Sequence, residues 1–455
     1  MGPVRQSGRT FLFFYMQNLS LVYQHFSKSS GPCTDTRRLK PDCFFIALRG
    51  PNFDANRFAA EALNGGASAC LVDDPALRGK SGCIYVPNTL TGLHRLAHYH
   101  RKRFHIPVIG LTGSNGKTTT KELIAAVLSQ KYKVHATMGN LNNHIGVPIT
   151  LLEMGEDTEI GIIEMGANQP GEIRMLCKLA NPDFGVITNV GKAHLEGFGS
   201  LDMIRQTKYE LLEHITLSSG VFFHNSDEKS LDDLKEINSE GMVRFGSGDL
   251  LSDGKWKIDK HEIVPAIKIT ISKGREELLL KSALFGAHNL QNIKVALAVG
   301  AHFDVPIHLM IQAISEYVPQ NNRSQIVQQG DNTYYMDAYN ANPSSMSKGL
   351  EFFDQLPHDE KILILGDMLE LGKISRNEHL AIIDKARKME KVQQILLIGH
   401  EFANAADKHV DPRISCFDEV DQLQVWLDKQ NWRAKHIFVK GSRGIHLENI
   451  LSGVK

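Results

Sequence analysis

The sequence predicts an α/β protein of three domains, built around a central, doubly wound and mostly parallel sheet. Its 455 residues correspond to about three domains. Short apolar runs alternate with helix-like segments along most of the chain, a pattern typical of doubly wound sheets. A glycine-rich turn within Gly110–Thr120 separates one of these runs from a helix-like segment. This order of strand, turn and helix is typical of phosphate-binding proteins.

The composition is that of an ordinary globular protein, with 42% hydrophobic and 22% charged residues. The formal net charge is zero, so we expect no surface dedicated to nucleic acid or anionic membranes. The six cysteines are scattered, without a C-x-x-C pair. They indicate reduced thiols rather than disulfides or a zinc site, and this predicts a cytoplasmic location.

The N-terminus contains an apolar run, Phe11–Met16, that follows Arg5 and Arg9. The run is too short for a signal peptide, and no small-residue cleavage site follows it. No other stretch is long enough to span a bilayer, so we expect no integral membrane segment. Met1 and Met16 both remain candidates for the start of the protein.

The first domain is expected over residues 16–105, as a small α/β unit. Strand-like runs at 43–48 and 69–72 flank a helical segment at 59–63, and a basic helix over 93–104 closes the domain.

His94 and His98 are four residues apart on that closing helix, which is the spacing of a metal-binding pair. No third ligand follows in a metal-binding pattern. We therefore expect a solvated helix face there.

The second domain is expected over residues 106–322, with strands at 108–112, 160–164 and 184–189. The third domain is expected over 323–455, as a Rossmann-like α/β unit without the G-x-G-x-x-G pattern of dinucleotide-binding proteins. Its predicted strands are residues 334–336, 362–365, 395–398 and 437–439. In such sheets, ligands bind at the carboxyl ends of the strands.

The turn after the strand at 108–112 has the residues needed to hold a nucleoside triphosphate. Glycines allow backbone N–H groups to approach phosphates, and the helix N-terminus favours anions. Lys117 is placed to reach the terminal phosphates, and the Thr118 hydroxyl is placed to hold Mg²⁺. The turn differs from the common G-x-x-x-x-G-K-[ST] pattern because Leu111 stands where that pattern has glycine.

Glu164 ends the predicted strand at 160–164, and a carboxylate at that edge is suited to Mg²⁺. His194 follows the strand at 184–189 and is expected at the same edge. Judged by its neighbours in the sequence alone, Lys208 is an ordinary helix-surface lysine. The amide-rich segment at 139–148 is either a polar-substrate loop or a plain connection, and both readings stay open.

Together these motifs resemble the Mur ligases, the ATP-dependent amide-forming enzymes of peptidoglycan precursor synthesis. The resemblance extends from about residue 30 over nearly the whole chain. The segments that carry it are Thr112–Thr119, Asn142-Asn143, Glu164–Asn168, Ala193–Gly199, Gly286–Asn289, Asp337–Pro343 and Lys440–Arg443.

The resemblance implies roles for the matched positions. ATP would be bound by Gly113, Ser114, Asn115, Gly116, Lys117, Thr118, Thr119, Asn289, Arg323 and Asp337. Thr118 and Glu164 would ligate one Mg²⁺ and His194 a second. Lys208 matches the lysine that the family carbamylates, which would make it a further metal ligand. The catalytic set would be Lys117, Glu164, His194 and Lys208. Substrate would be bound by Asp35, Thr36, Arg37, Leu48, Arg49, Gly50, Asn142, Asn143, Asn340 and Asn342. The first-domain match is looser, because Asp54–Arg57 departs from the usual Asp-Gly-His pattern.

Within the family, the segments at 337–346 and 366–372 are similar to those of the enzymes that add a preformed dipeptide. The implied reaction joins D-alanyl-D-alanine to UDP-N-acetylmuramoyl-tripeptide through an acyl phosphate, with ATP and Mg²⁺. We expect a monomer that acts on these small molecules and does not bind nucleic acid.

Three alternatives remain at this stage. Two are related ligases, the tripeptide-forming enzyme and a folylpolyglutamate-type enzyme. The sequence lacks the Asp-Asn-Pro-Arg-type motif of the former. The third is a regulatory ATPase that uses the phosphate turn without ligation. The regulatory ATPase hypothesis assigns no function to the first domain or to the turn at 340–343.

Overall fold

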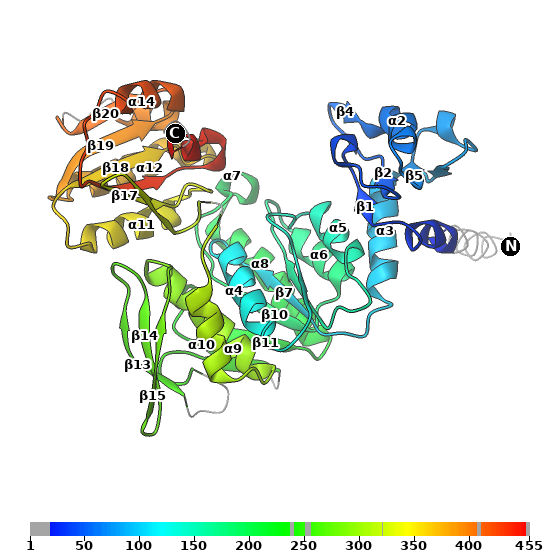
Figure 1. The fold of residues 1–455 in the computed structure, drawn as a ribbon, viewed down its shortest axis with the longest axis horizontal. Coiled ribbons are helices and arrows are strands. Elements are labelled where there is room, and N and C mark those ends of the chain that lie inside the picture. The colour runs from blue at the N-terminus through cyan, green and yellow to red at the C-terminus, as the bar shows by residue number, and fades with distance from the viewer. Residues whose placement is uncertain (1–18, 237–240, 251–255, 321, 407–410, 452–455) are drawn as a thin grey trace, which may run out of the picture. The chain divides into compact units, whose positions relative to one another are not determined.

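The computed structural model describes residues 19–236, 241–250, 256–320, 322–406 and 411–451, shown in Figure 1. These residues form two compact units. The first unit contains the described residues up to Gly110, together with 133–166 and 174–183. The second contains 111–132, 167–173 and the described residues from Phe184 onward. The choice between Met1 and Met16 falls outside the described residues.

A small four-stranded sheet with the order β1-β2-β5-β6 forms the start of the first unit, and its strand pairs are parallel. Its strands are β1 (Pro32–Cys33), β2 (Phe44–Ile46), β5 (Ala69–Val72) and β6 (Cys83–Tyr85). A short antiparallel hairpin joins β3 (Arg49–Gly50) to β4 (Phe53–Asp54), and the helices are α2 (Ala59–Asn64) and α3 (Thr89–Arg101). Buried Phe45, Ala59 and Cys70 belong to one apolar cluster, so α2 covers a face of this sheet.

The face of α3 that carries His94 is partly buried, and the expectation of a solvated face there is wrong. The His94 ring bonds to the His144 carbonyl through Nε2 at 2.6 Å, and burial lowers the pKa of this imidazole. Within the described part of the chain, no three His, Cys, Asp or Glu side chains come together to hold a metal ion.

The central sheet has six strands in the order β12-β11-β10-β7-β9-β8. The pairs β8–β9, β10–β11 and β11–β12 are parallel. The strands are β7 (Val108–Thr112), β8 (Val134–Ala136), β9 (Ile160–Glu164), β10 (Phe184–Ile187), β11 (Val221–Asn225) and β12 (Met242–Phe245). The helices are α4 (Lys117–Leu128), α5 (Gly146–Leu152), α6 (Glu172–Ala180), α7 (Leu195–Phe198), α8 (Leu201–Leu217), α9 (Ala287–His302) and α10 (Ile307–Glu316). Every residue of β7 and β9 is buried, as continuous apolar runs predict for parallel strands.

A three-stranded antiparallel sheet inserted before α9 is absent from the sequence-based expectation. It consists of β13 (Lys257–Glu262), β14 (Lys268–Lys273) and β15 (Glu276–Lys281). Ile269 and Ile271 on β14 are fully buried, so the alternation of apolar and polar residues there was a usable strand signal.

The C-terminal sheet has six strands in the order β16-β17-β21-β18-β19-β20, with β16 antiparallel to β17 and the other pairs parallel. The strands are β16 (Gln325–Gln329), β17 (Asn332–Met336), β18 (Lys361–Gly366), β19 (Val392–Ile398), β20 (Ile414–Phe417) and β21 (His436–Lys440). The helices are α11 (Pro343–Gln355), α12 (Ser375–Arg387), α13 (His400–Ala406) and α14 (Val420–Leu427). All four predicted strands of this region are confirmed.

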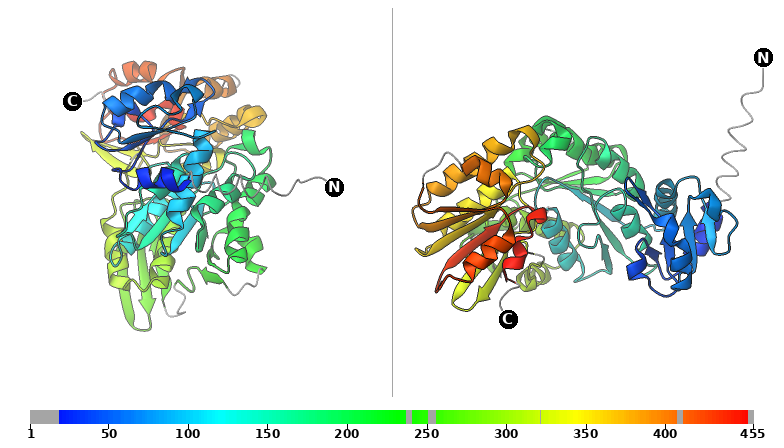
Figure 2. Two further views of the ribbon diagram at one scale, coloured as in Figure 1. Left: turned by 90° about the vertical axis from the view of Figure 1, so that its right-hand side faces the viewer. Right: turned by 90° about the horizontal axis from the view of Figure 1, so that it is seen from above.

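Helices cover both faces of this sheet (Figure 1 and Figure 2). Side chains of α11, α12 and α13 pack with Leu363 and Leu365 on one face. Side chains of α14 and the last turn pack with Ile362 and Ile364 on the other. Successive side chains of β18 therefore pack against helices on opposite faces of the sheet. This is a doubly wound unit, which confirms the predicted Rossmann-like architecture.

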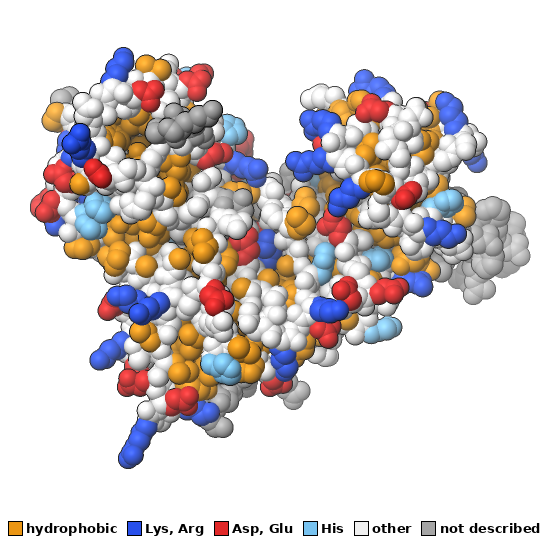
Figure 3. Space-filling view, in the orientation of Figure 1, with side chains coloured by type: hydrophobic (Ala, Val, Ile, Leu, Met, Phe, Trp, Pro, Cys, Tyr) orange, Lys and Arg blue, Asp and Glu red, His pale blue; other side chains and the backbone are white. Residues whose placement is uncertain are grey.

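The surface in Figure 3 carries interspersed acidic and basic side chains, as a net charge of zero predicts. Of the helices in the described ranges, none combines the length and apolarity needed to cross a bilayer.

Candidate functional site

The glycine-rich turn between β7 and α4 needs glycine at two positions. Gly116 precedes α4 with φ 78° and ψ 0°, and Gly113 has φ 147°. A Cβ at Gly113 would lie 1.9 Å from Thr188 Oγ1, and one at Gly116 would lie 2.7 Å from Asn292 Oδ1. Both the backbone angles and the close neighbours therefore exclude larger residues.

The loop after β10 holds this turn in place. The Ser114 N–H donates to the Asn189 carbonyl, and the Asn115 N–H donates to Asn189 Oδ1, each at 3.0 Å. The Asn115 carbonyl accepts from Thr188 Oγ1 at 2.7 Å and from Asn189 Nδ2 at 3.0 Å. Asn189 thus acts as a clamp on the turn, a role that the sequence did not suggest.

Lys117 begins α4 and folds back over the turn. Its Nζ donates to the Gly113 carbonyl at 2.8 Å and to the Ser114 carbonyl at 3.4 Å. Thr118 and Thr119 follow on the first turn of the twelve-residue helix and are buried. A lysine, a hydroxyl and a helix N-terminus thus lie together, and this combination can bind phosphate.

Glu164 ends β9 and is 1% exposed. Its Oε1 accepts from Asn142 Nδ2 at 2.8 Å, and its N–H donates to Thr137 Oγ1 at 3.0 Å. Asn143 Oδ1 accepts from the N–H groups of Ile145 and Gly146 at the start of α5. Asn142 therefore orients the carboxylate, whereas Asn143 supports the connection to α5.

His194 lies before α7 with φ 52° and forms an ion pair with Glu370 through Nδ1. The hydrogen bond from His194 lowers the pKa of the Glu370 carboxyl. Lys192 makes a second ion pair nearby, with Glu378 at 2.7 Å. The first pair joins the loop after β10 to the segment between β18 and α12, and the second joins the same loop to α12 itself. Sequence reasoning missed both glutamates.

Lys208 is buried on α8, so the expectation of an ordinary surface lysine is wrong. The residue is only 2% exposed, and its Nζ lies 5.8 Å from the centroid of the Phe198 ring. Burial, reinforced by the positive charge of Lys117, lowers the pKa of this amine to about 7. Near neutral pH, a large share of Lys208 is therefore an uncharged amine.

The turn after β17 connects the C-terminal sheet to the phosphate-binding turn. Asn342 caps α11 in a reciprocal capping box with Ser345, and its Nδ2 donates to Asn115 Oδ1 at 2.7 Å. Asp337 Oδ2 accepts from the buried Lys440 at 2.5 Å. Asn340 is exposed, and its Oδ1 accepts from the next backbone N–H. Residues 227 positions apart thus meet at the phosphate turn.

Asn289 on α9 is buried in a network of protein hydrogen bonds. Its Nδ2 donates to the Phe285 carbonyl at 2.8 Å and to Ser324 Oγ at 2.9 Å, and its Oδ1 accepts from Asn292. An adenine contact by this amide would require the network to open. Arg323, next to Ser324, stacks on the ring of Tyr339.

The predicted substrate residues of the first domain form two charged groups. Asp35 caps the turn Thr36–Arg38 and binds the Arg37 side chain, which lowers the pKa of Asp35 to about 2. Leu48 is half-buried and precedes the β3–β4 hairpin, whose first residues Arg49 and Gly50 are exposed.

In the second group, Arg49 Nε donates to Asp73 at 2.7 Å, and the buried Asn56 donates to both Asp54 and Asp73. Thr89, at the start of α3, also bonds to Asp73. Asn56 stands at the departure from the family pattern, and here its amide organises the carboxylates. The sequence did not point to Asp73 or Thr89.

These features define an α/β protein whose turn between β7 and α4 can bind phosphate. The Mur ligase middle domain matches residues 111–300, and the Mur ligase glutamate ligase domain matches 322–443. The UDP-N-acetylmuramoyl-tripeptide–D-alanyl-D-alanine ligase of Bacillus subtilis is 35% identical over 429 residues, which cover 92% of each chain. The chain therefore belongs to the Mur ligase family, as the sequence predicted.

Solved structures support the same three-domain fold. A crystal structure of MurF from Acinetobacter baumannii has a TM-score of 0.82 and 27% identity, covering 96% of this chain and 97% of the other. The MurF ligase of Thermotoga maritima, solved in complex with ADP, has a TM-score of 0.80 and 24% identity, covering 94% of this chain and 97% of the other. The predicted fold class is thereby confirmed.

Proposed function

We propose that the protein joins D-alanyl-D-alanine to UDP-N-acetylmuramoyl-tripeptide, with conversion of ATP to ADP and phosphate. The observation that carries this proposal is similarity over 92% of both chains to a curated ligase of that name. The turn between β7 and α4 supports the proposal, because such an enzyme needs a site for the phosphates of ATP. A cytoplasmic, monomeric enzyme with domains over 16–105, 106–322 and 323–455 remains our prediction.

The chemistry follows from the weakness of a carboxylate as an acyl donor. The terminal carboxylate of the tripeptide attacks the γ-phosphorus of ATP, the bond from that phosphorus to ADP breaks, and an acyl phosphate forms. The amine of the dipeptide then attacks the acyl carbon. Phosphate leaves with its bonding electrons, and the new amide loses one proton. The protein contributes mainly positioning and electrostatic stabilisation.

The residues of the phosphate turn have distinct parts in this proposal. Backbone N–H groups from Gly113 to Thr119 hold the phosphates, and Lys117 neutralises the group in transfer. Asn289, Arg323 and Asp337 are proposed to contact the rest of the nucleotide. The sugar-peptide and the dipeptide are proposed to be held by Asp35–Arg37, Leu48–Gly50, Asn142, Asn143, Asn340 and Asn342.

Mg²⁺ fits the oxygen donors of the proposed set. Thr118 offers a buried hydroxyl and Glu164 a buried carboxylate, which are the ligand types that this ion prefers. Bound Mg²⁺ would neutralise charge on the phosphates. His194 is a weaker match because it is a nitrogen donor whose Nδ1 already pairs with Glu370. The second ion would therefore need an oxygen ligand from elsewhere.

Carbamylation of Lys208 would supply that ligand. The uncharged amine attacks the carbon of CO₂, a nitrogen–carbon bond forms, one proton leaves, and a carbamate anion replaces the cation. Burial and the lowered pKa support this step because only the uncharged amine is nucleophilic. A ¹³C carbamate signal should appear with labelled bicarbonate in the wild type and be missing in Lys208→Arg.

Phosphate release tests the proposed function directly. The purified protein would receive ATP and Mg²⁺ with the sugar tripeptide and D-alanyl-D-alanine, singly and together. We expect release only with both, and a pentapeptide product by mass. Release without either would favour a regulatory ATPase. Release only with the sugar dipeptide and a diamino acid, or with a folate and glutamate, would indicate another ligase.

A further inference from the structure

Two arginines share the ring of Tyr339, which lies in the turn after β17. The guanidinium carbon of Arg323 is 3.3 Å from the ring centroid. That of Arg443 is 5.1 Å away, and its Nη1 donates to the Tyr339 hydroxyl at 3.0 Å. Arg323 thus covers the ring, whereas Arg443 lies toward the hydroxyl. We call these three side chains the arginine platform.

The platform has positive charge without a matching carboxylate. Among the described residues, no Asp or Glu oxygen lies within 4.0 Å of either guanidinium. Asp337, two residues before Tyr339, pairs with Lys440 instead. Arg323 Nε is buried without a hydrogen-bond partner. Adjacent guanidinium groups without a counter-ion are suited to binding an anion.

The protein holds Arg443 firmly, although the side chain itself is exposed. The preceding residue, Ser442, is 3% exposed. Its N–H donates to the Asp367 carbonyl at 3.0 Å, and its Oγ accepts from the Leu369 N–H at 2.9 Å. The backbone before Arg443 is therefore fixed, and Tyr339 orients the guanidinium. Four of its five N–H donors remain for a ligand.

The turn that carries Tyr339 contacts the phosphate-binding turn. Asn342, three residues after Tyr339 in the same turn, donates to Asn115. Two anions are therefore candidates, a phosphate of ATP and the terminal carboxylate of the dipeptide. The phosphate turn already has Lys117 and the N-terminus of α4 for the phosphates. Arg443 begins the short 3-10 turn after β21, and its planar fork matches a carboxylate.

We propose that Arg443, oriented by Tyr339, binds the C-terminal carboxylate of the D-alanyl-D-alanine acceptor. This assignment rests on the proposed function and deepens it. Pairing of the carboxylate would direct the amine at the other end of the dipeptide toward the acyl phosphate. It would also make the enzyme prefer a free acid to an uncharged acceptor of the same shape.

A comparison of two acceptors tests the assignment, because D-alanyl-D-alaninamide lacks only the negative charge. The wild type should prefer the acid by about tenfold to a hundredfold in kcat/KM, the range for a hydrogen bond to a charged group. In Arg443→Met, kcat/KM for the acid should fall by this same tenfold to hundredfold, whereas kcat/KM for the amide should change little. The preference for the acid should therefore disappear. The KM for ATP should stay within about twofold. Arg443→Lys should recover part of the preference.

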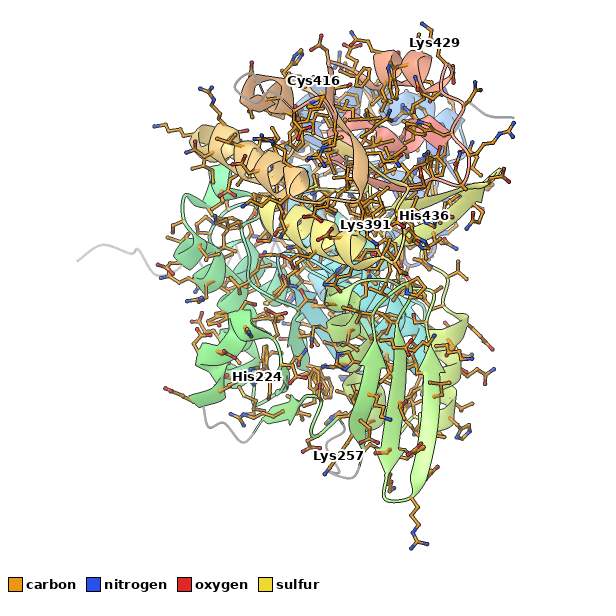
Figure 4. The ribbon with its side chains drawn as sticks, turned by 90° about the vertical axis from the view of Figure 1, so that its left-hand side faces the viewer. His224, Lys257, Lys391, Cys416, Lys429 and His436 are labelled. Atoms are coloured by element: carbon orange, nitrogen blue, oxygen red, sulfur yellow. The ribbon has the colours of Figure 1, made fainter. Side chains whose placement is uncertain are left out.

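Arg433→Met is the matched control. Arg433 is also exposed, but it lies before β21, near the end of the strand where His436 is labelled in Figure 4. It should keep the wild-type preference. Tyr339→Phe keeps the ring but removes the hydroxyl that accepts a hydrogen bond from Arg443, so we expect a partial loss of the preference for the acid.

Other results would overturn the assignment. If Arg443→Met raises the KM for ATP and keeps the preference for the acid, the platform serves the nucleotide. If the preference and both KM values stay unchanged, Arg443 binds neither ligand. Unchanged turnover of the amide shows that the variant is folded. If the wild type joins neither acceptor, the proposed function itself fails, and the assignment fails with it.

Discussion

Replacing Lys208 by methionine should change how the stability of the surrounding segment depends on pH. Lys208 is buried, and its pKa is lowered from 10.5 to about 7. Between these values, the unfolded chain holds a proton that the folded chain lacks. Stability therefore rises with pH across this window. Methionine has a similar shape without the charge, so the variant should lack this contribution.

The size of the effect follows from the two pKa values. One pKa unit corresponds to about 1.4 kcal/mol, so the buried cation costs the folded state roughly 5 kcal/mol at most. Between about pH 7 and pH 9, the Lys208 contribution to the free energy of unfolding should rise by about 2 kcal/mol. Lys208→Met should therefore be more stable than the wild type near pH 7, and this advantage should shrink by about 2 kcal/mol near pH 9.

Native-state hydrogen exchange of peptides from α8 measures the pH dependence of stability around Lys208, with exchange rates corrected for pH. Buffers depleted of CO₂ keep the amine unmodified. Lys229→Met is the control because Lys229 is exposed, and this variant should leave the pH dependence of the wild type unchanged. The argument would be refuted if the free energy of opening differed between wild type and Lys208→Met by the same amount at both pH values. Lys208 would then carry the same charge in the folded and unfolded states.

Three further changes test the rest of the structure. Lys117→Met should lower the rate of amide formation at least about a thousandfold, measured by phosphate release, because the group in transfer loses its cation; near-normal turnover would contradict the phosphate-turn assignment. Asn342→Asp should keep the cap of α11, so its melting temperature should not change. Its KM for ATP should rise, because a carboxylate would face Asn115 Oδ1. Asn342→Ala should also lose the cap, and with it about 1 kcal/mol of stability. Arg101→Met should cost about 3 kcal/mol in urea unfolding, since the buried guanidinium donates to three carbonyls; a loss below about 1 kcal/mol would show that water replaces those bonds.

The sequence predicted the phosphate turn correctly because each of its signals is local. A buried apolar strand, two glycines and a helix start occupy consecutive positions, and backbone sterics act over that distance. The C-terminal strands were predictable for the same reason. The meander of β13–β15 was missed although Ile269 and Ile271 alternate with polar residues, because it interrupts the alternation of strands and helices that guided the prediction.

Other parts of the site depend on residues that are far apart in the chain. Lys208 has polar neighbours in sequence, and only packing shows that it is buried beside Phe198. The ion pair of His194 joins residues 176 positions apart (370 minus 194). Asn289 looked free to bind a ligand, but Ser324 and Asn292 occupy its amide. No local pattern contains this information.

The sequence by itself determined the family, the doubly wound C-terminal sheet and the position of the phosphate turn, because these depend on backbone geometry and on the order of motifs. Tertiary structure decided the charge state of Lys208, the partners of His194 and Asp337, and the meeting of Arg323 and Arg443 on Tyr339. These properties depend on desolvation and on distances between charges. Both are set by which distant segments pack together, so they arise only when the chain is folded.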